Sequence, residues 1–192
     1  MSDILDRPRT PARRRLDVAA YYRMAEAGIL TQSDHVELIE GDIFDMTPIG
    51  SAHAGKTNRL NRLFARVAAE GLALVSVQRP LRLDAHNEPM PDLMLLRPRT
   101  DDYQDRHPGA ADVLLLVELS DTSLAYDRGT KVPLYARFGV PEVWIVDLRG
   151  AAVEVYRQPE GGAYAVMERL TSGPLAPALV PGVALDVGAL VG

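Results

Sequence analysis

The stretch 113–120, Val-Leu-Leu-Leu-Val-Glu-Leu-Ser, constrains the fold of this chain more than any other part of the sequence. Its first five residues are all apolar, so neither face is left for water, and the run is short enough for a central strand rather than a helix. Glu118 then places a carboxylate at the end of that strand. Burying an ionised carboxylate is costly unless a cation, a metal ion or strong hydrogen-bond donors lie beside it. The sequence therefore predicts a partner for Glu118 inside the fold.

A second apolar strand is predicted after Pro91, and it opens with another carboxylate, Asp92. If the two strands pair antiparallel, Asp92 lies beside Glu118, because neighbouring strands are about 4.8 Å apart. Two carboxylates that close suit a divalent cation that prefers hard oxygen ligands, such as Mg²⁺ or Mn²⁺. The alternative interpretation is structural, with Asp92 capping a turn and Glu118 paired with an arginine.

Lys131 adds a positive charge thirteen residues after Glu118, where a crossover helix is expected to begin. Pro133 is tolerated in the first turn of a helix, so Thr130 or a neighbour is the expected N-cap. This places Lys131 at an exposed helix start near the strand ends, where chemistry gathers in α/β folds. A lysine there can neutralise the carboxylates, orient or deprotonate an attacking water, or stabilise a pentacovalent phosphate.

The longest predicted helix, residues 51–70, carries a basic ridge beside its apolar stripe. A solvated helix face is one interpretation of this ridge, and a surface for a nucleic-acid backbone is the other. His53 lies at the start of the same helix, where it could act as a metal ligand, a proton shuttle or a capping group. The ridge consists of Lys56, Arg59, Arg62 and Arg66.

The composition excludes several classes of protein. The 192 residues include no cysteine, which excludes disulfide frameworks, thiol nucleophiles and cysteine-ligated metal centres. No apolar run reaches the roughly 18 residues of a membrane span, and no signal region follows the charged start, so we expect a cytoplasmic protein without membrane association. The formal net charge of −5 means that nucleic acid would bind at a local basic surface or a metal, not through overall charge.

The chain is expected to form a flexible basic tail, residues 1–16, followed by a single domain, residues 17–192. Strand, helix and strand between residues 113 and 147 predict a right-handed crossover, and hence a mixed sheet of the α/β (α+β) class. A strand is predicted over residues 72–83 and a C-terminal β-hairpin over residues 152–170, with further short strands beyond it.

Several residues of this chain, in their order along the sequence, resemble the pattern of a known family of nucleases. Asp92 after Pro91, Glu118 at the end of a buried strand and a following lysine resemble the PD-(D/E)XK nuclease pattern. From about residue 17 to 190 the sequence resembles more narrowly the restriction endonuclease family Uma2 (Uma-two). The positions that carry this resemblance are Glu37 to Gly41, His53, Pro91-Asp92, residues 117–123 and residues 127–147.

The resemblance implies a restriction-endonuclease-like fold, in which helices flank a mixed β-sheet core, and a divalent-metal site. Asp92 and Glu118 match the metal-binding acids, the Leu119 carbonyl matches a backbone ligand, and Lys131 matches the catalytic lysine. Ser120 stands where the general nuclease pattern has lysine, so that role is assigned to Lys131. Glu37 and His53 match further positions that the family tends to keep, and they complete the candidate catalytic set.

The function expected on this basis is that of a Mg²⁺- or Mn²⁺-dependent endonuclease that hydrolyses DNA phosphodiester bonds. The alternative is a catalytically silent protein of the same fold that binds nucleic acid or acts as a scaffold. A homodimer is expected, because two related active sites cleave both strands of a duplex most simply. Its contact could come from the apolar residues 180–187, which could equally pack within their own chain.

Overall fold

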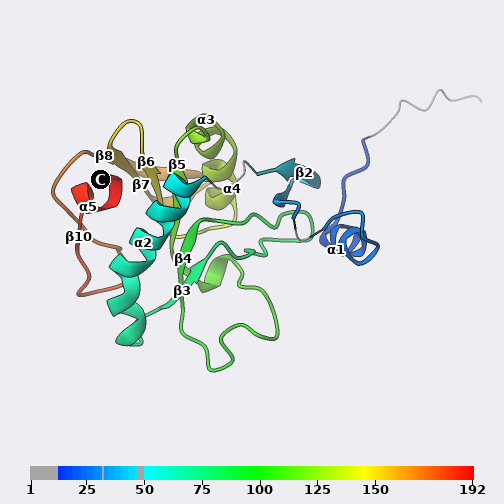
Figure 1. The fold of residues 1–192 in the computed structure, drawn as a ribbon, viewed down its shortest axis with the longest axis horizontal. Helices are drawn as coiled ribbons and strands as arrows, with labels where there is room; N and C mark the ends of the chain where they lie inside the picture. The colour runs from blue at the N-terminus through cyan, green and yellow to red at the C-terminus, as the bar shows by residue number, and fades with distance from the viewer. Residues whose placement is uncertain (1–12, 32, 47–49) are drawn as a thin grey trace, which may run out of the picture.

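The computed structural model describes residues 13–31, 33–46 and 50–192, and its centre is a six-stranded sheet (Figure 1). The strand order is β3-β4-β5-β6-β7-β8, in which β5 and β6 run parallel and the other neighbours run antiparallel. The expected mixed sheet is therefore confirmed. The strands are β3 Leu74–Val77, β4 Leu93–Leu96, β5 Val113–Ser120, β6 Glu142–Asp147, β7 Ala152–Glu160 and β8 Ala163–Leu170.

Strand β5 is the buried centre of the sheet, and all eight of its residues are buried. Leu115 and Val117 join one hydrophobic cluster, whereas Leu116 joins a second cluster on the opposite face. This division follows from the alternation of side chains along a strand. Because both faces are covered, only the end of β5 is available for polar chemistry.

Helices cover both faces of the sheet and make three layers (Figure 1). On one face, α2 (Ser51–Ala69) packs Phe64 and neighbouring apolar residues against the sheet, and α5 (Val187–Val191) lies beside it. On the other face, α4 (Val132–Arg137) packs Val132 and Tyr135 against β5 and β6. A short helix, α3 (Leu124–Tyr126), and a π-helical turn, Asp127–Lys131, lead into α4.

The N-terminal elements lie to one side of the sheet (Figure 1). Helix α1 (Val18–Glu26) begins after Asp17, whose side chain accepts a hydrogen bond from Ala20 N at 2.6 Å. The strands β1 (Val36–Ile39) and β2 (Asp42–Asp45) pair antiparallel around a turn at Gly41, which has a positive φ of 77°. Of the predicted tail, residues 1–12 lie outside the described residues, while Leu16 N donates to Gly41 O at 2.9 Å.

The predicted strand over residues 72–83 is shorter in the structure, because β3 ends at Val77. Gln78 has a positive φ of 47°, which turns the backbone out of the extended conformation, and Pro80 has no N–H for a sheet ladder. The C-terminal β-hairpin of β7 and β8 is present as expected. A separate two-stranded pair follows it, formed by β9 (Pro174–Leu175) and β10 (Leu185–Asp186).

Three apolar residues of the segment 180–187 pack inside their own chain. Val180, Leu185 and Val187 are at most 9% exposed and belong to the hydrophobic cluster under α2. Their burial gives them an intramolecular role, so they are not available as the contact of the expected homodimer. No helix in the described ranges is long and apolar enough to cross a membrane.

The buried carboxylate of Glu142 joins the C-terminal segment to the sheet, and its loss should destabilise the fold. It accepts hydrogen bonds from Trp144 Nε1 at 2.7 Å and Ala178 N at 2.6 Å, and it pairs with Arg157 at 2.8 Å. Glu142→Ala leaves these donors unpaired. We therefore expect the free energy of unfolding, measured by urea denaturation, to fall by about 3–5 kcal/mol. The exposed pair of Arg149 and Asp121 is the control, and Arg149→Ala should cost about 1 kcal/mol or less.

Candidate functional site

Asp92 lies just before β4 and is fixed by three donors. Because Leu93 pairs with Val117, the antiparallel register places Asp92 opposite Glu118. Its Oδ2 accepts from the backbone N–H of Leu119 at 2.8 Å. Its Oδ1 lies 2.8 Å from His53 Nε2 and 3.3 Å from the side-chain amide of Gln78. The hydrogen bond to Asp92 raises the pKa of His53, although burial opposes this.

The Leu119 carbonyl faces the same side of β5 as Asp92. In a strand, the N–H and C=O of one residue point toward the same neighbour, and Leu119 N–H points at Asp92. Strand β4 begins only at Leu93, opposite Val117. The carbonyl therefore lies beyond the end of the β4 ladder and next to the carboxylate of Asp92.

Glu118 is buried on the α4 side of the sheet. Its Oε1 accepts from Tyr135 OH at 2.6 Å and lies 3.3 Å from Lys131 Nζ. Burial raises the pKa of Glu118 to about 8, the charge of Lys131 opposes that shift, and the charge of Asp92 adds to it. The pKa of this carboxyl group therefore lies above the usual value for glutamate, although Lys131 limits the rise.

Lys131 does not lie at an exposed helix start, and this expectation was wrong. The helical segment already begins at Leu124, and Lys131 is only 5% exposed. Pro133, which donates no backbone hydrogen bond, is accommodated directly after the wider π-helical turn, so no new helix needs to start there. Burial lowers the pKa of Lys131, but the surrounding carboxylates outweigh it and raise the pKa above its usual value.

Glu37 completes the charge cluster from a distant part of the chain. It is buried in β1, with Oε2 at 3.2 Å from Lys131 Nζ. Met90 N donates to the same oxygen at 3.2 Å, and Tyr126 OH donates to Oε1 at 3.2 Å. The ammonium group of Lys131 therefore lies between the carboxylates of Glu37 and Glu118.

The structure thus brings together all the predicted catalytic and metal-binding residues: Glu37, His53, Asp92, Glu118, Leu119 and Lys131. Three residues of the cluster were not predicted: Gln78, Tyr126 and Tyr135. Tyr135 follows Lys131 by four residues, a helical spacing that would have revealed it. The sequence carried no comparable signal for Gln78, whose contact with Asp92 depends on its left-handed backbone.

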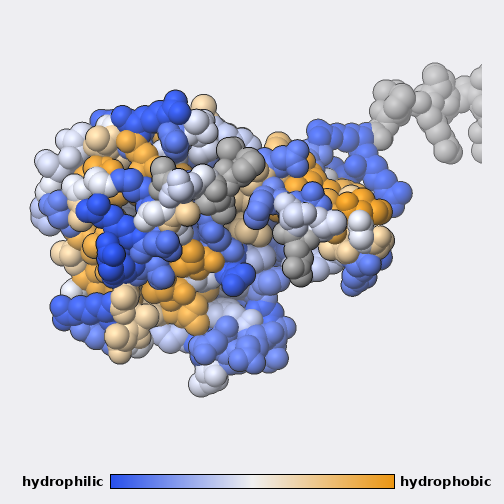
Figure 2. Space-filling view, viewed as in Figure 1, coloured by the Kyte–Doolittle hydropathy of each residue, from blue (hydrophilic) through white to orange (hydrophobic). Residues whose placement is uncertain are grey.

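The predicted basic ridge on α2 is divided in the structure. Lys56 Nζ donates to Val191 O at 3.3 Å, so its side chain turns toward α5. Arg66 pairs with Glu70 in the last turn of α2, at the opposite end of the helix from His53. Arg62 is exposed on α2. Figure 2 shows hydrophilic residues over part of this region, mixed with more hydrophobic ones. The nucleic-acid-binding role of Arg59 and Arg62 stays a prediction.

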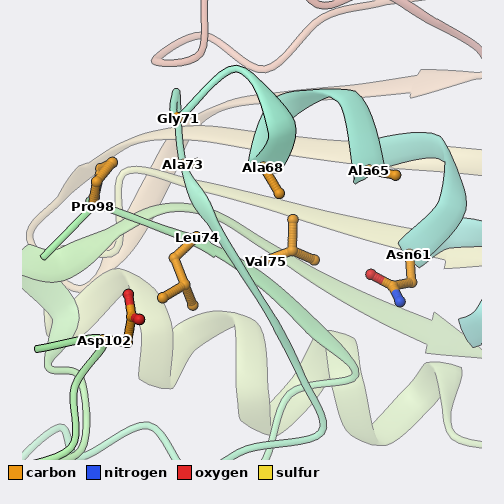
Figure 3. Close-up of a pocket in the computed structure, with 9 residues that line it drawn as sticks. All are labelled: Asn61, Ala65, Ala68, Gly71, Ala73, Leu74, Val75, Pro98 and Asp102. Atoms are coloured by element: carbon orange, nitrogen blue, oxygen red, sulfur yellow. The ribbon is translucent and has the colours of Figure 1, made fainter. Parts of the chain in front are cut away.

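Two cavities lie away from the charge cluster. One, of about 530 Å³, lies between α2 and the edge strand β3, with Ala65, Ala68 and Val75 among its lining residues (Figure 3). The other, of about 680 Å³, lies between α1 and the loop before β5, next to Tyr22 and His107. Neither cavity is lined by a predicted catalytic residue.

The oxygen donors at Asp92 and Glu118 are of the type that a divalent cation prefers. Two carboxylates and one backbone carbonyl supply the hard oxygen ligands that Mg²⁺ and Mn²⁺ prefer, and Mg²⁺ usually keeps several waters. Within the described ranges, no group of three or more His, Asp or Glu side chains could hold a metal ion. A cation here would therefore need the Leu119 carbonyl and water in addition to the two acids.

Comparison with known proteins identifies the family. Residues 18–188, most of the chain, match the family Uma2, described as "Putative restriction endonuclease". The chain belongs to the Uma2 family. No curated protein matches the sequence.

Among solved structures, the chain is similar to one from Anabaena variabilis described as a "putative nuclease", with a TM-score of 0.70 and 15% sequence identity. The match covers 92% of this chain and 97% of the other. This similarity establishes that the Uma2 chain shares the fold of that structure, in agreement with the expected restriction-endonuclease-like class.

The raised pKa of Glu118 predicts how the stability of the metal-free protein depends on pH. The folded pKa of about 8 lies above the ordinary value of 4.5, so the unfolded chain loses its proton first as the pH rises. Folding stability should therefore fall between about pH 4.5 and pH 8. Glu118→Gln has no proton to lose, and its melting temperature should exceed that of the wild type at pH 8 but not at pH 4.5.

The matched control is Glu160→Gln, which changes an exposed carboxylate on β7. It should show no pH-dependent difference from the wild type. Equal melting temperatures for Glu118→Gln and wild type at pH 8, in buffer with a metal chelator, would contradict the raised pKa of Glu118.

Proposed function

We propose that this Uma2 protein is a divalent-metal-dependent DNA endonuclease. The observation that carries the proposal is the buried ammonium group of Lys131, which lies 3.3 Å from Glu118. The strand of Glu118 also fixes Asp92, through the backbone N–H of Leu119. A lysine beside two convergent acids combines a binding site for a cation with a fixed positive charge for phosphate chemistry. Membership of the Uma2 family supports a nuclease, and the choice of metal and of DNA rests on the chemistry of these residues.

Asp92, Glu118 and the Leu119 carbonyl are the residues that would hold Mg²⁺ or Mn²⁺. When bound there, the cation would supply Lewis-acid stabilisation of the phosphate and lower the pKa of a water. Lys131 orients the attacking water and stabilises the negative charge that develops on the phosphate. Glu37 holds the ammonium group of Lys131 from the opposite side and keeps it charged.

His53 and the α2 surface provide the remaining proposed contacts. His53 orients Asp92 through its Nε2 and, with its raised pKa, can carry a proton close to the site of cleavage. Arg59 and Arg62 lie on the same helix, where they can contact the backbone of DNA. The expected homodimer stays a prediction, which light scattering tests: a mass near 21 kDa at micromolar concentration would contradict it.

Metal binding should stabilise the wild type and not a variant without the Asp92 carboxylate. At about 100 times its dissociation constant, a ligand that binds only the folded state adds about 2.7 kcal/mol, or about 5–10 °C in a protein of this size. We expect such a rise in melting temperature with Mn²⁺, and none for Asp92→Asn. Asp105→Asn, in an exposed loop, is the control and should respond like the wild type. An equal rise in Asp92→Asn would place the metal elsewhere.

Lys131→Met should abolish cleavage without abolishing metal binding. Methionine fills the buried space of the lysine stem but lacks the charge, so the rate should fall by about 10²–10⁴-fold. Cleavage of supercoiled plasmid, linear duplex, single-stranded DNA and RNA with Mn²⁺ measures this and identifies the substrate. Lys56→Met, which changes the other lysine of the chain, is the control.

Two outcomes distinguish the alternatives. A Lys131→Met variant that cuts at the wild-type rate would contradict the role of this lysine. A wild type that binds Mn²⁺ at Asp92 but cleaves none of the four substrates would favour the catalytically silent, nucleic-acid-binding alternative.

A further inference from the structure

The direction of the Lys131 side chain depends on an unusual helical turn. Residues Asp127–Lys131 form a π-helical turn, in which Val132 N–H donates to Asp127 O, five residues earlier. One additional residue in a helix rotates the side chains that follow by about 100°. If the turn relaxed to an α-helix, Lys131 would no longer point between Glu37 and Glu118. Turns of this kind are rare and are frequently found at functional sites.

The first residue of the π-helical turn is tied to the end of β5. The carboxylate of Asp127 is buried, and its Oδ2 accepts from Ser120 Oγ at 2.6 Å and from Ser123 Oγ at 2.7 Å. Ser120 is the last residue of β5 and lies two residues after Glu118. The strand that carries Glu118 therefore also holds the turn that carries Lys131. We name the Asp127 carboxylate and these two hydroxyl groups the serine latch.

The second residue of the turn is tied to another strand. Arg128 Nε donates to Glu154 Oε2 at 2.9 Å, and Glu154 is fully buried in β7. Tyr156 OH donates to the same oxygen at 2.7 Å. Two successive residues of the turn are thus anchored to two different strands, which resists its rotation as a unit.

We propose that Ser120, Ser123 and Asp127 are positioning residues that hold the π-helical turn and thereby fix Lys131 between Glu37 and Glu118. The importance of this role for cleavage rests on the proposed function, but the positioning itself is measurable without any cleavage. If the Asp127 carboxylate needed hydrogen-bond donors only because it is buried, those donors could come from any part of the chain. Instead, both side-chain donors, Ser120 and Ser123, belong to the segment that links Glu118 to the π-helical turn.

The composition of the chain allows a direct measurement, because Lys56 and Lys131 are its two lysines. An amine-acylating reagent such as N-hydroxysuccinimide acetate modifies lysines at a rate that reports how often each amine becomes accessible. Peptide mass spectrometry then gives the labelling rate of Lys131 relative to Lys56. Global unfolding would raise both rates, whereas opening of the π-helical turn would raise the rate of Lys131 alone.

In the wild type, Lys131 should be labelled much more slowly than it is in urea. Ser120→Ala and the double variant Ser120→Ala/Ser123→Ala should raise the Lys131-to-Lys56 ratio, by about tenfold for one buried hydrogen bond and more for two. Ser123→Thr keeps the hydroxyl donor, so Lys131 should stay as slowly labelled as in the wild type. Lys131 should also be labelled more slowly in Asp127→Asn than in Asp127→Ala. Tyr103→Phe is the control, since it removes a hydroxyl that bonds Arg97 O in a distant loop.

Cleavage supplies the second readout. The serine variants should reduce kcat while the Mn²⁺-induced rise in melting temperature is preserved, because Asp92 and Glu118 are unchanged. If even the wild type cleaves no substrate, the proposed function fails while the labelling ratio still tests the latch. If the double variant and Asp127→Ala melt cooperatively yet keep Lys131 as protected as in the wild type, the latch is overturned. Should Asp127→Ala not fold, the two serine variants decide the question.

Discussion

The structure depends on the burial of one ammonium group between two carboxylates. Lys131 contacts Glu37 at 3.2 Å and Glu118 at 3.3 Å, and all three side chains are nearly inaccessible. Charges buried in this way stay in the fold only if each is paired and hydrogen-bonded, because an unpaired buried charge costs about 3–5 kcal/mol. The tyrosines Tyr126 and Tyr135 supply the additional donors. The hairpin of β1 and β2, the end of β5 and the crossover helix must therefore meet at one point.

The central sheet supplies the rigidity that this arrangement needs. Strand β5 is buried on both faces, with α2 on one side and α4 on the other, so the position of Glu118 is fixed by packing as well as by its polar contacts. The antiparallel neighbour β4 then determines where Asp92 lies, through its hydrogen bond with Leu119 N. A site built on strands in this way is held more firmly than one built on loops.

The lysine of this site comes from a helix rather than from the strand that carries Glu118. Where the general nuclease pattern has lysine, Ser120 turns instead to Asp127 and anchors the π-helical turn. Ser120 is thus connected to Lys131 indirectly, because it contacts the π-helical turn that carries Lys131. Arg128 and Glu154 extend the same support to β7. The proposed role of Lys131 therefore depends on the backbone geometry of this turn.

The sequence by itself determined the elements whose signals are local. The apolar run before Glu118 predicted a buried central strand, and residues 152–170 predicted the C-terminal β-hairpin. The sequence also predicted that Asp92 would lie close to Glu118. This prediction required only the two strands, both of which have local signals, and their antiparallel pairing. The pattern also singled out His53 and Lys131, and the resemblance to the Uma2 family added Glu37, although neither predicted their contacts.

Only the tertiary structure decided the environment of Lys131, the role of Glu37 and the burial of the C-terminal apolar residues. A helix start at Thr130 and a continuous helix through a π-helical turn satisfy the same local preferences around Pro133, so local propensity did not distinguish them. Contacts with segments far apart in the chain distinguish the two arrangements. Strand β1 brings Glu37 to the ammonium group, and Glu118 contacts the same group from the sheet. Val180 and Val187 fill the core under α2 for the same reason, since the sheet face there has apolar surface to cover.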